Sequence, residues 1–273
     1  MMTRVFFALV AVAAILAASN YSSEIAAWHA SREAKLKAED GWLSLAGLFW
    51  LQEGANPFGK DPGGEIVLPD GPVHAGVFHL DHGKVTVTID GATREVKPDS
   101  DDIVKVGRVR LLVIKRGDKY GIRMKDPESE ARREFKGIES YPADESYRVT
   151  AKWVAEPRKI PILNVLGQTE ASECPGYAVF TLKGREFSLH PIIEEPGAKE
   201  LFYIFKDETS GKETYPAGRF FYSGMPQDGH VILDFNKAYN PPCAFSPYAT
   251  CPLPPPENRL AVRIEAGEKR YGH

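Results

Sequence analysis

The chain has 273 residues, of which 43% are hydrophobic, and this is enough apolar material for one large or two small domains with a core. Its 34 basic and 37 acidic residues are scattered along the sequence. A largely disordered chain is therefore excluded, and nucleic acid is not expected as a partner because phosphate binding needs a concentrated basic patch.

The first 19 residues have the layout of a secretory signal peptide. Arg4 precedes an uninterrupted apolar run from Val5 to Ala18, and Ser19 follows. This run is shorter than the about 20 apolar residues of a membrane-spanning helix, and no cysteine follows it as in a lipoprotein. We expect cleavage near Ser19 and export to the periplasm or beyond the cell. Contact with a membrane is expected only through an uncleaved signal.

Residues 20–40 are predicted to form one amphipathic helix. Ile25, Trp28 and Leu36 recur near one side at helical spacing. The next stretch, residues 42–51, is dense in leucine and aromatic residues. It fits a buried core better than the lining of a ligand pocket.

Residues 41–125 are predicted to form a small β subdomain. Val85, Val87 and Ile89 alternate with threonines, and glycine-containing turns separate the apolar runs. The polar stretch 126–145 is predicted to be a linker.

This first β segment resembles forkhead-associated domains. Gly59-Lys60 and Val73-His74-Ala75 carry the resemblance, which spans about 60 residues. The Ser-Arg and Asn-Gly groups that shape the phosphothreonine site of those domains are missing. The resemblance therefore implies a small β-sandwich and not that ligand.

Residues 146–273 are predicted to form a C-terminal β domain. In the run "SYRVTAKWVAE", Val149, Ala151 and Trp153 alternate with Arg148, Thr150 and Lys152, as in a half-buried strand. Hairpins are expected around Lys183-Gly184 and Ser210-Gly211. The predicted fold is mainly β, with two packed antiparallel β subdomains, sandwich or barrel-like, preceded by one N-terminal amphipathic helix.

The segment 234–260, here termed the proline-rich segment, contains seven of the 21 prolines. Strands are expected on both sides of it, with His230, Ile232 and Asp234 on the outer face of the first. In the second strand, Leu260 and its alternate neighbours should face inward. Fixed proline φ angles would hold the polar side chains of the segment without much mobility.

Two of the three cysteines also lie in the proline-rich segment. Cys243 and Cys251 are eight positions apart, and an oxidising compartment would allow a disulfide between them. A redox-active pair is the weaker reading because the C-x-x-C spacing is absent. Buried free thiols, including the isolated Cys174, are a further alternative.

We expect the proline-rich segment to help bind a small polar or anionic ligand. Arg219, whose forked donors suit a carboxylate or phosphate, would form one wall of the site. The predicted ligand-binding residues are Arg219, Asp234, Asn236, Tyr239, Asn240, Asn258 and Arg259.

Two alternatives remain open at this stage. In the first, the chain is a hydrolase that uses Asp234 as the base, together with Arg219 and Tyr239. In the second, the polar side chains are scaffold, because they replace the N–H donors that prolines lack. No catalytic residue is otherwise assigned.

No metal or cofactor is expected. His74 and His79 fall on opposite faces of an extended strand, and His82 belongs to the following turn. His190 and the acidic residues after it sit at a strand end, where they do not form a metal-binding helix. The Walker, Rossmann, G-x-S-x-G and H-E-x-x-H motifs are absent.

The runs "KETYPAGRFF", "LDFNKAYNPPCAFSPYATCPLPPPENRL" and "IEAGEK", with "DGWLSLAGLFWL" and "FG" upstream, resemble the bacterial family of unknown function numbered 1684. The resemblance spans nearly the whole mature chain. It implies an organisation of the chain rather than a chemistry, and it supplies no catalytic residues.

Overall fold

The structure is a computed structural model that describes the backbone of residues 2–272 and the side chains of residues 20–272. The chain divides into two compact units. Unit 1 comprises Met1–Ala34, Gly137–Ala244 and Cys251–His273, and unit 2 comprises Lys35–Lys136 and Phe245–Thr250. The change of unit at residues 136 and 137 falls within the stretch predicted as a linker. The prediction of a mainly β fold with an N-terminal helix is confirmed.

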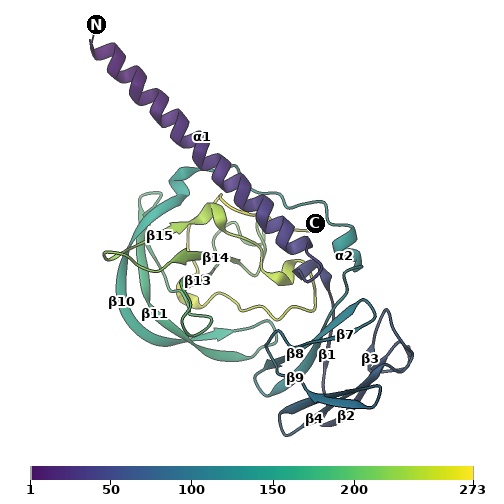
Figure 1. Cartoon of the computed structure of the whole chain (residues 1–273). Coiled ribbons are helices and arrows are strands. Elements are labelled where there is room, and N and C mark those ends of the chain that lie inside the picture. The colour runs from purple at the N-terminus through teal and green to yellow at the C-terminus, as the bar shows by residue number, and fades with distance from the viewer. Residues whose placement is uncertain (1, 273) are drawn as a thin grey trace. The chain divides into compact units, whose positions relative to one another are not determined.

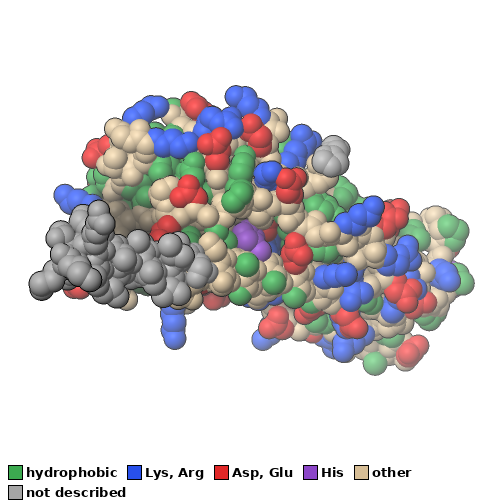
Figure 2. All heavy atoms as spheres, turned by 90° about the horizontal axis from the view of Figure 1, so that it is seen from above, with side chains coloured by type: hydrophobic (Ala, Val, Ile, Leu, Met, Phe, Trp, Pro, Cys, Tyr) green, Lys and Arg blue, Asp and Glu red, His purple; other side chains and the backbone are tan. Residues whose placement is uncertain are grey.

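The N-terminal helix is α1 (Met2–Lys37), which ends three residues before the predicted end. The side chains of the predicted signal peptide, residues 1–19, lie outside the described ones. Among the residues that are described, no helix is long and apolar enough to cross a membrane. Figure 2 shows acidic and basic side chains mixed over the face in view.

Unit 2 consists of two sheets around one core. The first has the order β1-β9-β8-β7 with antiparallel pairing, and the second has the order β3-β2-β4-β5-β6. Alternate apolar side chains such as Phe78 and Ile122 are fully buried between them. The elements are β1 (Leu45–Trp50), β2 (Gly54–Gly59), β3 (Ile66–Val67), β4 (Gly76–Asp81), β5 (Lys84–Ile89), β6 (Ala92–Glu95), β7 (Ile103–Val106), β8 (Val109–Arg116), β9 (Lys119–Lys125), the short helix α2 (Glu130–Arg133) and the 3₁₀ helix η1 (Trp42–Ser44).

Unit 1 contains a four-stranded antiparallel sheet of order β12-β11-β10-β15 and the hairpin β13-β14. Figure 1 shows the two long strands β10 and β11 curving around β13 and β14. The elements are β10 (Arg148–Leu163), β11 (Thr169–Leu182), β12 (Arg185–Leu189), β13 (Glu200–Phe205), β14 (Arg219–Gly224), β15 (His230–Asp234) and the 3₁₀ helices η2 (Glu145–Tyr147), η3 (Phe235–Lys237), η4 (Pro242–Ala244) and η5 (Pro256–Asn258).

The core of unit 1 is aromatic. The ring of Phe221 packs on those of Tyr203, Phe205 and Phe235, with centroids 4.7 to 5.6 Å apart. All four side chains are 0% exposed. Truncating a phenylalanine in such a site costs about 3–5 kcal/mol of stability, so this cluster anchors β13, β14 and the start of η3 to one another.

The two predicted hairpins have different outcomes. Lys183 and Gly184 make the tight turn between β11 and β12, with φ of 50° and 74°. In the other hairpin, Phe205 pairs with Arg219, so residues 206–218 connect the strands and the predicted turn lies inside a longer connection.

The alternation predicted for this strand is confirmed for residues 230–233, whereas Asp234, also expected to face outward, is buried and contacts Tyr21 of α1. Val231 and Leu233 are in the core of unit 1, whereas His230 and Ile232 are exposed. The predicted strand after the proline-rich segment is wrong, because residues 261–268 belong to no named strand. The inward positions Leu260, Val262 and Ile264 are nevertheless buried in the same core.

Candidate functional site

Arg219 begins β14 and is enclosed by its own chain, with 0% of its side chain exposed. Gly218 precedes it with a φ of 102°, and a Cβ at this position would lie 2.4 Å from the carbonyl oxygen of Phe205. The Asp207 carboxylate lies 3.6 Å from Nη2, and it opposes the lowering of the Arg219 pKa by burial. The guanidinium donates to the main-chain carbonyls of Ile264, Ala266 and Glu268.

Two predicted amides, Asn236 and Asn258, hold backbone segments. Asn236 accepts from the N–H of Asp144 and donates to its carbonyl, both at 2.9 Å. Asn258 accepts from the N–H of His190 at 2.8 Å and donates to the carbonyls of His190 and Ile204 at 2.9 Å. Each amide thus replaces main-chain partners that a segment rich in proline lacks.

Asp234 contacts helix α1. Its Oδ1 atom accepts from the Tyr21 hydroxyl at 2.8 Å and from the N–H of Asn236 at 3.1 Å, and the Asn236 amide donates to the same hydroxyl at 2.8 Å. Burial raises the pKa of Tyr21, and the carboxylate of Asp234 raises it further. Lys237 pairs with Glu24 of α1 at 2.7 Å.

Arg32, which lies further along α1 than Tyr21, contacts both Asn240 and Tyr239. Arg32 donates to the carbonyl of Asn240 at 3.0 Å and lies 3.4 Å from Oε1 of Glu268. Its guanidinium carbon lies 4.5 Å from the centroid of the Tyr239 ring. Burial raises the pKa of Glu268, whereas Arg32 and the Asn240 amides oppose that rise.

A second acid lies beside Tyr239. The Tyr239 ring stacks on Tyr222 at 6.3 Å, and the Tyr222 hydroxyl donates to Glu194 at 2.6 Å. Although Glu194 is exposed, the protein around its carboxyl raises the pKa, and the Tyr222 hydrogen bond opposes this. In the sequence this acid stands out only by its closeness to His190, and no local pattern indicates its contact with Tyr222.

Arg259 lies apart from these contacts. Its side chain is exposed, and its backbone forms a parallel bridge with Lys206. Within residues 20–272, no hydrogen bond or ion pair joins any two of Arg219, Asp234 and Tyr239, the three residues of the hydrolase alternative. The other predicted residues have side-chain partners inside the chain, and the role of all seven in ligand binding stays a prediction.

The predicted disulfide between Cys243 and Cys251 is wrong for this structure, which contains no disulfide in the part of the chain it describes. The Cys243 N–H donates to the sulfur of Cys251 at 3.1 Å, and the Cys251 N–H donates to the sulfur of Cys243 at 3.4 Å. These contacts direct each sulfur at the backbone of the other residue. The thiol of Cys174 is buried and donates to the Gly176 carbonyl.

Histidine contributes to one group with metal-ligand spacing in the described residues. Ligand atoms of Glu53, Asp81 and His82 lie within 4.8 Å of one another, and all three residues are exposed. Glu53 accepts the N–H of His82 at 2.7 Å, and Asp81 lies 2.6 Å from its Nδ1. The carboxylates therefore support the turn between β4 and β5.

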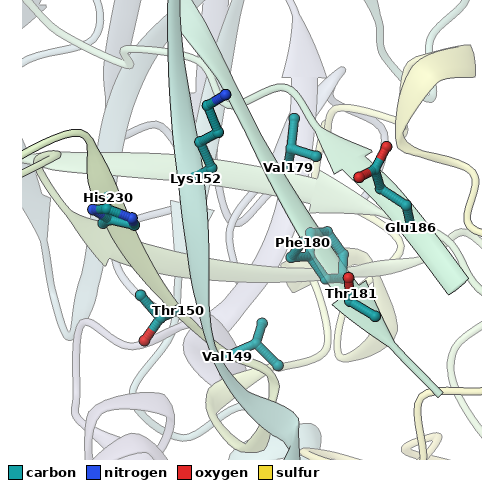
Figure 3. A pocket seen from close by; sticks show the side chains of 8 residues that line it. All are labelled: Val149, Thr150, Lys152, Val179, Phe180, Thr181, Glu186 and His230. Atoms are coloured by element: carbon teal, nitrogen blue, oxygen red, sulfur yellow. The ribbon is translucent and has the colours of Figure 1, made fainter. Parts of the chain in front are cut away.

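A hollow of about 480 Å³ opens on the outer face of the β12-β11-β10-β15 sheet, and it is here termed the outer hollow. Strand alternation directs Thr150 and Lys152 outward on β10, while Glu186 extends from β12 and His230 from β15 (Figure 3). The hollow is lined by Val149, Thr150, Lys152, Val179, Phe180, Thr181, Glu186 and His230.

The strand register sets the charges of the outer hollow. Lys152 lies opposite His230 on one side and Val179 on the other. Neither Lys152 nor Glu186 has an ion-pair partner among the described residues. His230 donates from Nδ1 to the Asp228 carbonyl at 2.9 Å; since a carbonyl only accepts, Nδ1 carries the proton and Nε2 is left for other contacts.

Sequence reasoning missed the outer hollow as a site. The alternation of β10 and β15 does predict that Thr150, Lys152 and His230 face outward. However, no local pattern shows that these two strands are neighbours, and this pairing across about 80 positions is what brings the residues together.

The geometry defines a mainly β protein in which polar side chains of the proline-rich segment hold backbone and helix, while an outer sheet face carries an open hollow. Residues 133–269 match the family described as "Protein of unknown function (DUF1684)", and the chain belongs to this family. The match corrects the predicted extent of the resemblance, because the aromatic stretch 42–51 and the rest of the first β subdomain lie outside it.

A solved structure of an uncharacterised protein from Haloarcula marismortui is also similar to the chain. The two sequences are 32% identical, the similarity covers 50% of this chain and 78% of the other, and the TM-score is 0.43. No curated protein is a match.

Proposed function

We propose that the chain is an exported binding protein that takes a small anionic ligand in the outer hollow. This keeps the ligand class expected from the sequence and moves the site away from the proline-rich segment, because the donors of Arg219 already serve main-chain carbonyls. One observation carries the proposal. Lys152 and His230 are register neighbours that line the same hollow, and Lys152 has no acidic partner among the described residues.

The chemistry of the lining suits a carboxylate or phosphate. The Lys152 ammonium offers three donors, and the Thr150 hydroxyl on the same strand offers one more. Because Lys152 and Thr150 lie on a strand, their backbone positions are fixed more precisely than those of loop residues. A hollow of about 480 Å³ is within the range of small-molecule sites.

Export is the second part of the proposal, and the N-terminal pattern of Arg4 and the apolar run Val5 to Ala18 supports it. The test is mass spectrometry of the protein recovered from the periplasm of a bacterial host. A mature N-terminus near residue 20 is expected. An intact N-terminus in the membrane fraction would contradict cleavage.

Ligand binding is tested by NMR titration of the labelled protein with acetate and with inorganic phosphate. Saturable shifts are expected at Thr150, Lys152 and His230, and the double variant Lys152→Ala with His230→Ala should lose them. Lys159→Ala is the matched control, because Lys159 is an exposed lysine of the same strand that pairs with Glu173 and does not line the hollow. The absence of saturable shifts around the hollow with either anion would overturn the proposal.

A further inference from the structure

We propose that the outer hollow selects dipolar ligands that carry a carboxylate at one end and an amino group several atoms away at the other. This inference rests on the function proposed above and specifies its ligand. The cationic group of the hollow, Lys152, lies on β10 beside His230 of β15, whereas its acidic group, Glu186, lies on β12. The hollow is therefore polarised across the sheet.

The register fixes the order of groups between the two ends. Lys152 lies opposite Val179, and Glu186 lies opposite Thr181, two residues further along the same strand. β11 thus separates the cationic end from the acidic end. Its outward side chains offer an apolar surface at Val179 and a hydroxyl at Thr181.

Elsewhere on this sheet a lysine and a glutamate on neighbouring strands form an ion pair, whereas the charges of the hollow do not. Lys159 lies opposite Glu173 in the register of β10 and β11, and the pair is 3.1 Å apart. Because Lys152 has Val179 in the corresponding place, its charge has no cross-strand acid, and Glu186 likewise has no ion pair among the described residues. A ligand with both charges would pair with both ends at once.

The spacing of the ends sets the length of the ligand. Lys152 and Glu186 are two strands apart and offset by two residues, which places their Cα atoms about 12 Å from each other at ordinary strand spacing and rise. An α-amino acid has both charges on one carbon and reaches one end only. An ω-amino acid or a dipeptide has the length to reach both ends, with its methylene chain over Val179.

The test is isothermal titration with three matched probes: 5-aminovalerate, pentanoate and pentylamine. Since partly exposed ion pairs contribute modestly, 5-aminovalerate should bind roughly 2- to 5-fold more tightly than pentanoate. Glu186→Gln should remove that advantage, and Lys152→Ala should weaken the binding of both carboxylates. Glu170→Gln, at an exposed acid of β11 that does not line the hollow, should behave as the wild type.

The outcomes separate this inference from the proposed function. If pentanoate binds as tightly as 5-aminovalerate, or if Glu186→Gln keeps the preference, ligand selection by the acidic end is overturned while anion binding stands. If neither carboxylate binds, the proposed function falls together with this inference.

Discussion

The proline-rich segment and the outer hollow are both rich in polar side chains, but these side chains are buried and hydrogen-bonded in the segment and exposed to solvent in the hollow. In the segment, Asn236, Asn240 and Asn258 are at most 1% exposed, and each donates to the main chain of another part of unit 1. In the hollow, Lys152 and Glu186 face solvent without an ion-pair partner in the described residues. Residue type alone does not distinguish a scaffold from a binding surface.

What distinguishes the two regions is where the hydrogen bonds go. A buried amide that already holds an N–H and a carbonyl has little capacity left for a ligand, and removing it leaves backbone groups without partners. A solvated charge is free to exchange water for a ligand at small cost. Substitutions should therefore reduce stability in the first region and binding in the second.

The largest effect is expected for Arg219→Met. This change removes the positive charge of a buried ion pair with Asp207 and leaves three main-chain carbonyls without the guanidinium donor, so the free energy of unfolding should fall by about 3–5 kcal/mol. Urea denaturation measures the loss. Arg259→Met is the control, because Arg259 is exposed and its replacement should change stability by less than about 0.5 kcal/mol.

An Arg219→Met protein of unchanged stability would break the comparison. It would show that the buried guanidinium is not part of the scaffold, and the ligand role predicted for Arg219 would regain support.

A smaller loss is expected for Tyr21→Phe. The hydroxyl donates to Asp234 and accepts from Asn236, and its removal from this buried contact should cost about 1–3 kcal/mol. Tyr248→Phe is the matched control, since Tyr248 is 39% exposed. The same urea assay applies to both variants.

Coupling sharpens this second prediction. Tyr21→Phe combined with Asp234→Ala should destabilise unit 1 by less than the sum of the single changes, because both remove the same hydrogen bond. Strictly additive effects would contradict a direct contact between α1 and the proline-rich segment.

A third prediction concerns pH and His190, which the Asn258 amide holds by its backbone. Burial, assisted by the charge of Arg158, lowers the pKa of His190. The folded state therefore binds this proton less readily than the unfolded state, so stability is complete above the ordinary histidine pKa and falls as the pH drops below it. One such proton contributes a slope of at most about 1.4 kcal/mol per pH unit.

His190→Gln should flatten the decline in unfolding free energy between about pH 7 and pH 5, where histidine titrates. Part of the decline will remain, because burial also lowers the pKa of His29. Identical slopes for the wild type and the variant would contradict a neutral buried imidazole.

The smallest effect on stability is expected in the outer hollow. Lys152→Ala removes an exposed side chain without an ion pair among the described residues, so the free energy of unfolding should change by less than about 0.5 kcal/mol while acetate binding is lost. A substantial loss of stability would place Lys152 with the scaffold and remove the contrast between the two regions.

Much of the fold follows from local pattern. The alternation of Val149 with Thr150 predicts the faces of β10, and Lys183-Gly184 predicts the turn that closes β11 and β12. The strand predicted after the proline-rich segment is not formed. Leu260, Val262 and Ile264 point inward at every second position, as in a strand, but this stretch belongs to no named strand.

The candidate sites were less predictable, because they depend on contacts between distant positions. Tyr21 meets Asp234 across 213 positions, and no local pattern in either segment indicates this contact. The sequence Asn-Lys-Ala-Tyr-Asn does not show whether its amide side chains bind a ligand or form hydrogen bonds with the backbone. The alternative in which polar side chains replace missing N–H donors predicts backbone contacts of this kind, but only the fold identifies the partners.

The contact made by the Tyr21 hydroxyl also limits how many N-terminal residues can be removed without a loss of stability. A signal peptidase that cuts at Ser19 would release a chain whose second residue is this tyrosine, so the contact with Asp234 would survive maturation. A cut only a few bonds further along would discard it and leave Asn236 facing water. Under the proposed export, signal cleavage and the folding of unit 1 would therefore depend on the same short stretch of chain.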